Sequence, residues 1–192
     1  MKNDWCYWMN AFTPEQCDSI IESALKLPRV ESALGYDSGG HDYSARRSYV
    51  RWINEENPDF THVFDSMWKY LRSINNEWFN FNVTHLPPMQ FTEYDASYMG
   101  EYKRHQDIFW VNPTTRHRKV SMVLQLTDPN DYTGGDLNIE SFSFSPSNDD
   151  KKAIRYRGTV IAFTSFTWHA LEPVTAGRRY SLVAWFEGPK FT

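Results

Sequence analysis

Two histidines and one aspartate are the residues of this chain most able to do chemistry. His105 and Asp107 are separated by a single residue, and His169 follows much later in the chain. Two imidazoles and one carboxylate can occupy one face of a six-coordinate Fe(II) and leave the opposite positions open for other ligands. The pattern therefore predicts a metal centre that can accept further molecules.

An arginine ten positions after His169 adds a second signal. Because side chains alternate across a strand, the last predicted strand places one set on a single face: Arg179, Ser181, Val183 and Trp185. An arginine that points into a sheet is costly unless an anion meets it, and its planar fork pairs a carboxylate through two bonds. We therefore predict that Arg179 anchors a dicarboxylate. The alternative is an Arg179 that faces solvent, as we expect of Arg178, or pairs with Glu172.

The other histidines have no partner at ligand spacing: His41, His62, His85 and His117. Taken alone, His105 lies among polar residues and is typical of a solvated side chain. His169 follows an apolar stretch and on its own is typical of a hydrogen-bonded core histidine. The metal hypothesis rests on the combination of residues.

Composition excludes some classes of function. The chain has 192 residues, a net charge of −4 and 17% aromatic residues. This length indicates one domain, and an acidic balance argues against nucleic acid as a partner. We expect no membrane association, because no apolar run approaches the ~18 residues of a membrane span. Two cysteines outside any disulfide framework, and a polar start, predict a cytoplasmic location.

Two helices are expected in the first part of the chain. Thr13, Pro14 and Gln16 form a helix-start pattern with a capping box, and Pro28 is expected to stop that helix. A second helix is predicted over about 58–78 from apolar residues at helical spacing. Short strands are expected over 5–9 and 48–53. The intervening 35–45 stretch is rich in Gly, Ser and Asp and predicts a mobile loop.

From residue 86 onward the pattern becomes typical of strands. Five candidates are rich in β-branched and aromatic residues and are separated by turn signals: 89–94, 120–126, 137–139, 159–163 and 180–186. Gly134 and Gly135 are expected to form a tight hairpin with positive φ. Helices followed by antiparallel strands predict an α+β, mainly β fold: a double-sheet barrel of the jelly-roll or cupin-like type, with the N-terminal helices packed on one sheet.

The C-terminal half resembles the prolyl 4-hydroxylase-like branch of the 2-oxoglutarate/Fe(II)-dependent dioxygenases, over about residues 86–188. The matching stretches occur in the family's order: 89–94, 102–107, 119–126, 132–137, 157–163 and 169–182. Pro173, Val174 and Gly177 lie between His169 and Arg179 as in the family. Many members have Lys at the position of Arg179. In having Arg there, the chain resembles the branch of oxygen-sensing protein hydroxylases and of bacterial and phage homologues.

The resemblance implies roles for particular residues. His105, Asp107 and His169 would be the metal ligands and catalytic residues, and Arg179 would bind the distal carboxylate of 2-oxoglutarate. The co-substrate pocket would include further residues: Tyr102, Tyr94, Gln125 and Ser181. The implied cofactors are Fe(II), 2-oxoglutarate and O2, with ascorbate as a candidate reductant. Relatives often have a shorter turn in place of the 95–101 segment. The substrate of those relatives therefore does not carry over to this chain by analogy.

The resemblance implies a double-stranded β-helix. It also implies one oxygenase domain over 1–192, in which 1–85 give helical support and a lid loop and 86–192 form the jelly-roll catalytic core. We expect hydroxylation of a prolyl residue in a peptide or protein, in the host cytoplasm if the chain is phage-encoded. One alternative substrate is a free amino acid or small metabolite. Another alternative is a non-catalytic jelly-roll metal-binding module. The 35–51 loop, with Arg46, Arg47 and Arg51, could clamp a peptide or close over a small acid.

Overall fold

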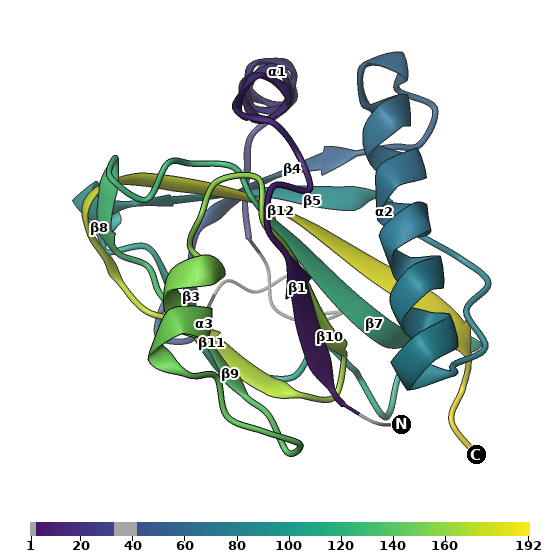
Figure 1. Ribbon diagram of the computed structural model, residues 1–192. Helices are drawn as coiled ribbons and strands as arrows, with labels where there is room; N and C mark the ends of the chain where they lie inside the picture. The colour runs from purple at the N-terminus through teal and green to yellow at the C-terminus, as the bar shows by residue number, and fades with distance from the viewer. Residues whose placement is uncertain (1–2, 33–41) are drawn as a thin grey trace.

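Two antiparallel sheets form the frame of the protein. The computed structural model describes residues 3–32 and 42–192 (Figure 1). The larger sheet runs in the order β1-β10-β7-β12-β5-β4-β2, with β8 paired to β12, and the smaller in the order β3-β6-β11-β9. The strands of the larger sheet are β1 (Trp5–Trp8), β2 (Val30–Glu31), β4 (Tyr49–Ile53), β5 (Met89–Asp95), β7 (Arg116–Gln125), β8 (Tyr132–Gly134), β10 (Val160–Thr164) and β12 (Val174–Pro189). The smaller sheet contains β3 (Arg46–Arg47), β6 (Glu101–His105), β9 (Leu137–Glu140) and β11 (Trp168–Leu171).

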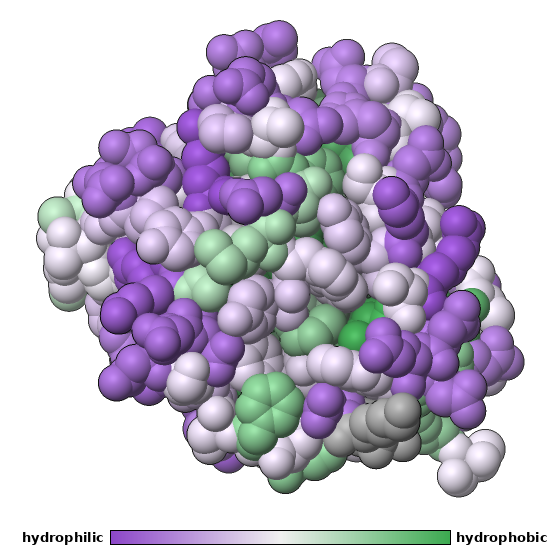
Figure 2. Space-filling view, viewed as in Figure 1, coloured by the Kyte–Doolittle hydropathy of each residue, from purple (hydrophilic) through white to green (hydrophobic). Residues whose placement is uncertain are grey.

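Helices cover the outer face of the larger sheet. They are α1 (Pro14–Leu25) and α2 (Thr61–Ile74), with one turn before α2, η1 (Pro58–Phe60), and one π-helical turn after it, η2 (Asn75–Phe79). In Figure 1, α2 crosses in front of β7 and β12, and the ring of Trp68 contacts that of Phe186 on β12. Hydrophilic residues cover both helices in Figure 2, while apolar residues show in the hollow between them.

The alternation of side chains on β7 and β12 separates two interiors. Val120, Met122 and Leu124 of β7 lie in the apolar core beneath the helices. The residues between them face the smaller sheet, where a second apolar cluster contains Val123 and Phe163. A helix-covered sheet that packs on a second sheet confirms the predicted mainly β jelly roll.

The first helix has the predicted start. Thr13 accepts a hydrogen bond from the Gln16 backbone N, and the Gln16 side chain accepts one from Thr13, so the capping box is complete. The helix ends at Leu25, before Pro28, because the chain turns at Lys26. The second predicted helix is divided into η1, α2 and η2.

Several elements were not predicted from the pattern. These are β2, β3, β6, β8, β11 and a short helix, α3 (Asn148–Ala153). The N-terminal part contributes β1 to β4 to both sheets, in addition to its helices. Most of the 35–45 loop lies outside the described residues. Cys6 and Cys17 are free thiols, and no helix in the described ranges is long and apolar enough to cross a membrane.

Candidate metal and co-substrate site

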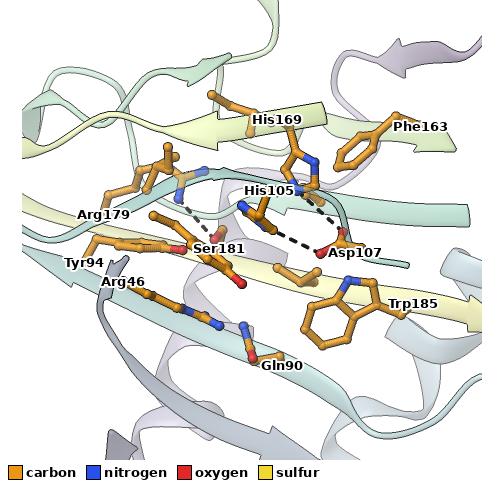
Figure 3. Close-up of a pocket in the computed structure, with 15 residues that line it drawn as sticks. Arg46, Gln90, Tyr94, His105, Asp107, Phe163, His169, Arg179, Ser181 and Trp185 are labelled. Atoms are coloured by element: carbon orange, nitrogen blue, oxygen red, sulfur yellow. Dashed lines mark hydrogen bonds and ion pairs between the residues drawn. The ribbon is translucent and has the colours of Figure 1, made fainter. Parts of the chain in front are cut away.

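His105, Asp107 and His169 converge between the two sheets. His105 is the last residue of β6 and His169 lies on β11, where the two residues are register partners. Asp107 follows β6, and its carboxylate oxygens lie 3.6 Å from His105 Nε2 and 3.5 Å from His169 Nε2 (Figure 3). One ligand atom from each residue lies within 4.8 Å of the others. The spacing leaves room for one cation bound by all three.

The outer nitrogens of both histidines are held by backbone carbonyls. His105 Nδ1 lies 2.8 Å from the carbonyl oxygen of Lys103, and His169 Nδ1 lies 3.0 Å from that of Thr167. A carbonyl can only accept, so each Nδ1 carries the proton and each Nε2 presents its lone pair. This tautomer is the one that a metal ligand requires.

The Asp107 carboxylate is buried and held in place. Ser121 Oγ donates to Asp107 Oδ2 over 2.6 Å and lies 2.9 Å from Ser165 Oγ. Burial raises the pKa of Asp107, but the facing His169 and His105, with Arg118, hold it well below its usual range. Burial, together with His105, lowers the pKa of His169 to about 4. At neutral pH the site therefore offers one carboxylate and a neutral imidazole, which suits a divalent cation.

Arg179 is a buried cation across the cavity from the histidines. It is 2% exposed, and its Nη1 and Nη2 donate to Ser181 Oγ at 3.2 Å and Gln125 Oε1 at 2.8 Å. Its Nε is buried and has no hydrogen-bond partner. Arg179 has no acidic partner in the described part of the chain, and it does not pair with Glu172. A buried guanidinium in this state is poised for an anion.

One cavity contains both the triad of His105, Asp107 and His169 and the guanidinium of Arg179. The ring of Tyr102 stacks on that of His105, with centroids 3.5 Å apart, and burial raises the pKa of Tyr102 to about 12. Tyr94 lies beside Arg179, 5.6 Å from its guanidinium carbon to the ring centroid. Apolar side chains complete the wall: Val123, Leu137, Phe163, Leu171 and Val183.

A longer groove adjoins this cavity. One hollow, of about 1050 Å³, shares Asp107, Tyr102 and Trp185 with the cavity. A second, of about 940 Å³, shares Trp52, Arg118 and Trp185 with the first hollow. The first hollow therefore adjoins the cavity at Asp107, and the second adjoins the first at Trp52, Arg118 and Trp185.

Three of the predicted pocket residues line the cavity, namely Tyr102, Tyr94 and Ser181. Gln125 is not among the lining residues and instead holds Arg179 from behind. Sequence reasoning did not select Ser121, although strand alternation on β7 places it on the face of Gln125. It also did not select Gln90, and it named Arg46 only as part of a loop that could clamp the substrate, although both residues line the cavity.

A model of the 2OG-Fe(II) oxygenase superfamily matches residues 89–187, more than half of the chain. The chain belongs to the 2OG-Fe(II) oxygenase superfamily. This confirms the family that the motifs of the C-terminal half predicted. The matched range contains His105, Asp107, His169 and Arg179.

Curated relatives of this oxygenase match shorter stretches. A PKHD-type hydroxylase of Synechococcus sp. (strain JA-2-3B'a(2-13)) is 38% identical over 69 residues, which are 35% of this chain and 28% of that protein. The matched stretch is thus less than a third of the relative's length.

Solved structures share the fold of this oxygenase over nearly its whole length. A Pseudomonas putida prolyl-4-hydroxylase superposes with a TM-score of 0.72 at 18% identity, covering 97% of this chain and 94% of that one. A prolyl hydroxylase from Trichoplax adhaerens, in complex with a hypoxia inducible factor peptide fragment, gives a TM-score of 0.71 at 18% identity, covering 96% and 83%. At this identity the likeness concerns the fold.

Proposed function

We propose that this chain is an Fe(II)- and 2-oxoglutarate-dependent dioxygenase that hydroxylates a prolyl residue in a peptide or protein. One observation carries the proposal: the triad of His105, Asp107 and His169 shares a cavity with Arg179, a buried cation that has no acidic partner among the described residues. A non-catalytic metal-binding module has no use for a buried anion site at this position.

The donor set fits the proposed cofactors. Nε2 of His105, Nε2 of His169 and the Asp107 carboxylate would hold Fe(II), since imidazole and carboxylate ligands on one face suit non-haem iron. Arg179 would bind the distal carboxylate of 2-oxoglutarate, with Ser181 beside it and Tyr94 against it. Gln125 acts one step back, because its Oε1 accepts from Arg179 and orients the guanidinium.

The bound iron, with 2-oxoglutarate and O2, would supply the oxidant that replaces an unactivated C–H bond by C–OH. The chain's own residues position the reactants and exclude water. Ser121 fixes the Asp107 carboxylate, and the stacked Tyr102 ring limits rotation of His105. The apolar wall, which includes Phe163 and Leu171, keeps water from the reacting face.

The groove favours a peptide, and not a small molecule, as the substrate. Its two hollows extend well beyond the cavity and present aromatic side chains, including Trp52 and Trp185. A free amino acid would need only the space next to the triad. A structural neighbour that holds a peptide fragment shows that the same fold can accommodate such a ligand.

The proposal extends to domain organisation, location and partners. We propose that residues 1–192 form a single oxygenase domain that acts in the cytoplasm, without nucleic-acid or membrane partners. Ascorbate is proposed as a reductant that restores Fe(II) after turnover without substrate.

Succinate formation tests the proposal. Protein purified without oxygen and loaded with Fe(II) should convert 2-oxoglutarate to succinate when O2 is admitted, and proline-containing peptides should raise the rate. Stimulation by free proline or another amino acid, and by no peptide, would instead favour a small substrate.

Asp107→Ala is the matched variant for this assay, because it removes one ligand and one negative charge from the site. It should abolish succinate formation while Asp149→Ala, at an exposed position on α3, should not. Succinate formation that survives in Asp107→Ala, or that is absent from iron-loaded wild-type protein, would contradict the oxygenase activity.

A further inference from the structure

A single turn holds both the aspartate and the second histidine of the triad. The turn connects β10 to β11 and comprises Thr164 to Thr167; we refer to it as the ligand turn. The carbonyl oxygen of Ser165 accepts from the Asp107 backbone N at 2.9 Å. The carbonyl oxygen of Thr167 accepts from His169 Nδ1 at 3.0 Å. A shift of the ligand turn would therefore move Asp107 and His169 together.

The side chain of Asp4, far away in sequence, holds the ligand turn. Asp4 is fully buried, and its carboxylate accepts from Thr167 Oγ1 at 3.3 Å. Its own backbone oxygen accepts from the Thr164 N at 2.9 Å. The hydroxyls of Thr164 and Thr167 lie 2.7 Å apart, which closes the network. Asp4 thus accepts hydrogen bonds from the ligand turn through both its backbone oxygen and its side chain.

The same carboxylate also accepts hydrogen bonds from the segment that follows β9, the strand paired with β11 at His169. Ser141 Oγ donates to Asp4 Oδ1 at 2.5 Å, Ser143 Oγ donates to the same atom, and the Phe142 N donates to Oδ2 at 3.1 Å. These residues directly follow β9, whose Ile139 is the register partner of His169. Asp4 therefore connects the two segments that flank His169.

The donors that meet Asp4 in the described part of the chain are neutral. Within the described ranges it has hydroxyl and backbone N–H donors and no ion pair. A buried carboxylate is tolerated when such donors satisfy its lone pairs, so this position demands an acceptor-only group. An amide in its place would turn two hydrogens toward donors.

We propose that Asp4 is a positioning residue for the metal centre, which acts through Thr167 on His169 and through the ligand turn on Asp107. The inference rests on the proposed metal site. It assigns to an N-terminal side chain, outside the cavity, control over the geometry of two of the three ligands.

Co(II) binding tests the proposal without turnover. The metal alone is titrated into the full chain, and the visible Co(II) bands report both affinity and the ligand geometry. Asp4→Asn is expected to weaken Co(II) binding by about 10–100-fold, the usual effect of residues that orient metal ligands, and to change the shape of the bands. Far-ultraviolet circular dichroism establishes that the variant is folded.

A second pair of variants separates positioning from general stability. Thr167→Val keeps the side-chain shape and loses the hydroxyl that donates to Asp4, whereas Thr167→Ser keeps the hydroxyl. Weak Co(II) binding by Thr167→Val, with binding restored in Thr167→Ser, supports the proposal even if Asp4→Asn does not fold. Thr13→Ala, which removes the cap of α1 far from the site, should lower the melting temperature and leave Co(II) binding unchanged.

Two results would overturn the inference. One is a folded Asp4→Asn or Thr167→Val protein that binds Co(II) within twofold of wild type with the same bands. The other is a Thr13→Ala protein whose Co(II) binding weakens as much as theirs. Failure of the wild-type protein itself to bind Co(II) would overturn the proposed metal site, and this inference with it.

Discussion

Arg179 is the residue whose environment most narrows the chemistry of the cavity. Its guanidinium is buried with two neutral acceptors, Ser181 and Gln125, and one unpaired N–H. Burying such a cation costs free energy unless an anion pairs with it. The neighbouring Arg178 shows the contrast, because it is exposed and already paired with Asp95.

Arg179→Ala should weaken 2-oxoglutarate binding by about 2–5 kcal/mol, because a charge-assisted pair is lost and the ligand carboxylate is left without a partner. Metal affinity should change little, since Arg179 does not contact the triad. Isothermal titration with 2-oxoglutarate in the presence of Mn(II) measures the loss, and Arg178→Ala serves as the exposed control. An unchanged dissociation constant for Arg179→Ala would place the anchor elsewhere.

His117 predicts a dependence of stability on pH. Burial, with the nearby Lys119 and Lys190, lowers the pKa of His117 below its ordinary 6.5, and its Nδ1 accepts from the Phe191 N, which requires the neutral ring. As pH falls below 6.5, His117 becomes protonated in the unfolded chain while it stays neutral in the folded protein. The free energy of unfolding should therefore fall with pH, by up to about 1.4 kcal/mol per unit.

His117→Asn keeps an acceptor near Nδ1 and cannot titrate, so it isolates this contribution. Urea unfolding above and below pH 6.5 measures both proteins. The advantage of the wild type over the variant should shrink in the acidic range. A difference that stays constant would show that His117 is not the group responsible.

At the scale of elements, the sequence reveals what is local and misses what depends on pairing. The capping box of Thr13 and Gln16 is a local signal, and α1 begins where it predicts. By contrast, β6 reads Glu-Tyr-Lys-Arg-His and shows no apolar alternation. It becomes a strand because β3 and β11 pair with it on either side.

Part of the candidate site could be predicted because some of its residues lie at fixed offsets on one strand. Alternation placed Arg179 and Ser181 on one face, and the structure puts both in the cavity. The role of Gln125 behind Arg179, and of Asp4 beneath the ligand turn, could not be predicted. Both depend on which distant segments meet, and no spacing in the sequence encodes that.

Gly177 allows β12 to pass close to β8 next to Arg179. Its φ is 68°, and a Cβ there would lie 2.0 Å from the Asp131 carbonyl oxygen. Gly177→Ala should therefore destabilise the protein by about 1–3 kcal/mol from backbone strain, with the steric clash added. It should also weaken 2-oxoglutarate binding, because β8 and β12 can no longer pair as closely next to Arg179. Urea denaturation and titration measure the two effects.

Thr175→Ala is the matched control on the same strand, because Thr175 has no positive φ and is exposed, and the change removes only an exposed hydrogen bond to the Thr133 carbonyl. It should change both quantities only slightly. Equal effects from the two variants would mean that side-chain contacts, and not the conformation of Gly177, maintain the pairing of β8 with β12.

At the scale of the whole molecule, the proposed ligands would link the two sheets. His105 and His169 belong to the smaller sheet, whereas Arg179 and Ser181 belong to the larger one, and the cavity lies between them (Figure 3). A co-substrate that contacts both the metal and Arg179 would therefore act as a bridge. Its binding should stabilise the packing of one sheet on the other and not only the cavity wall.

Thermal unfolding should show this bridge as a stepwise gain. A ligand at 100 times its dissociation constant stabilises the folded state by about 2.7 kcal/mol, which for a chain of this size raises the melting temperature by roughly 5–11 °C. Mn(II) alone should give one increment, and 2-oxoglutarate a second that requires Mn(II). In Arg179→Ala the first increment should remain and the second should largely vanish. A second increment of equal size without the metal, or in Arg179→Ala, would show that 2-oxoglutarate binds outside this cavity.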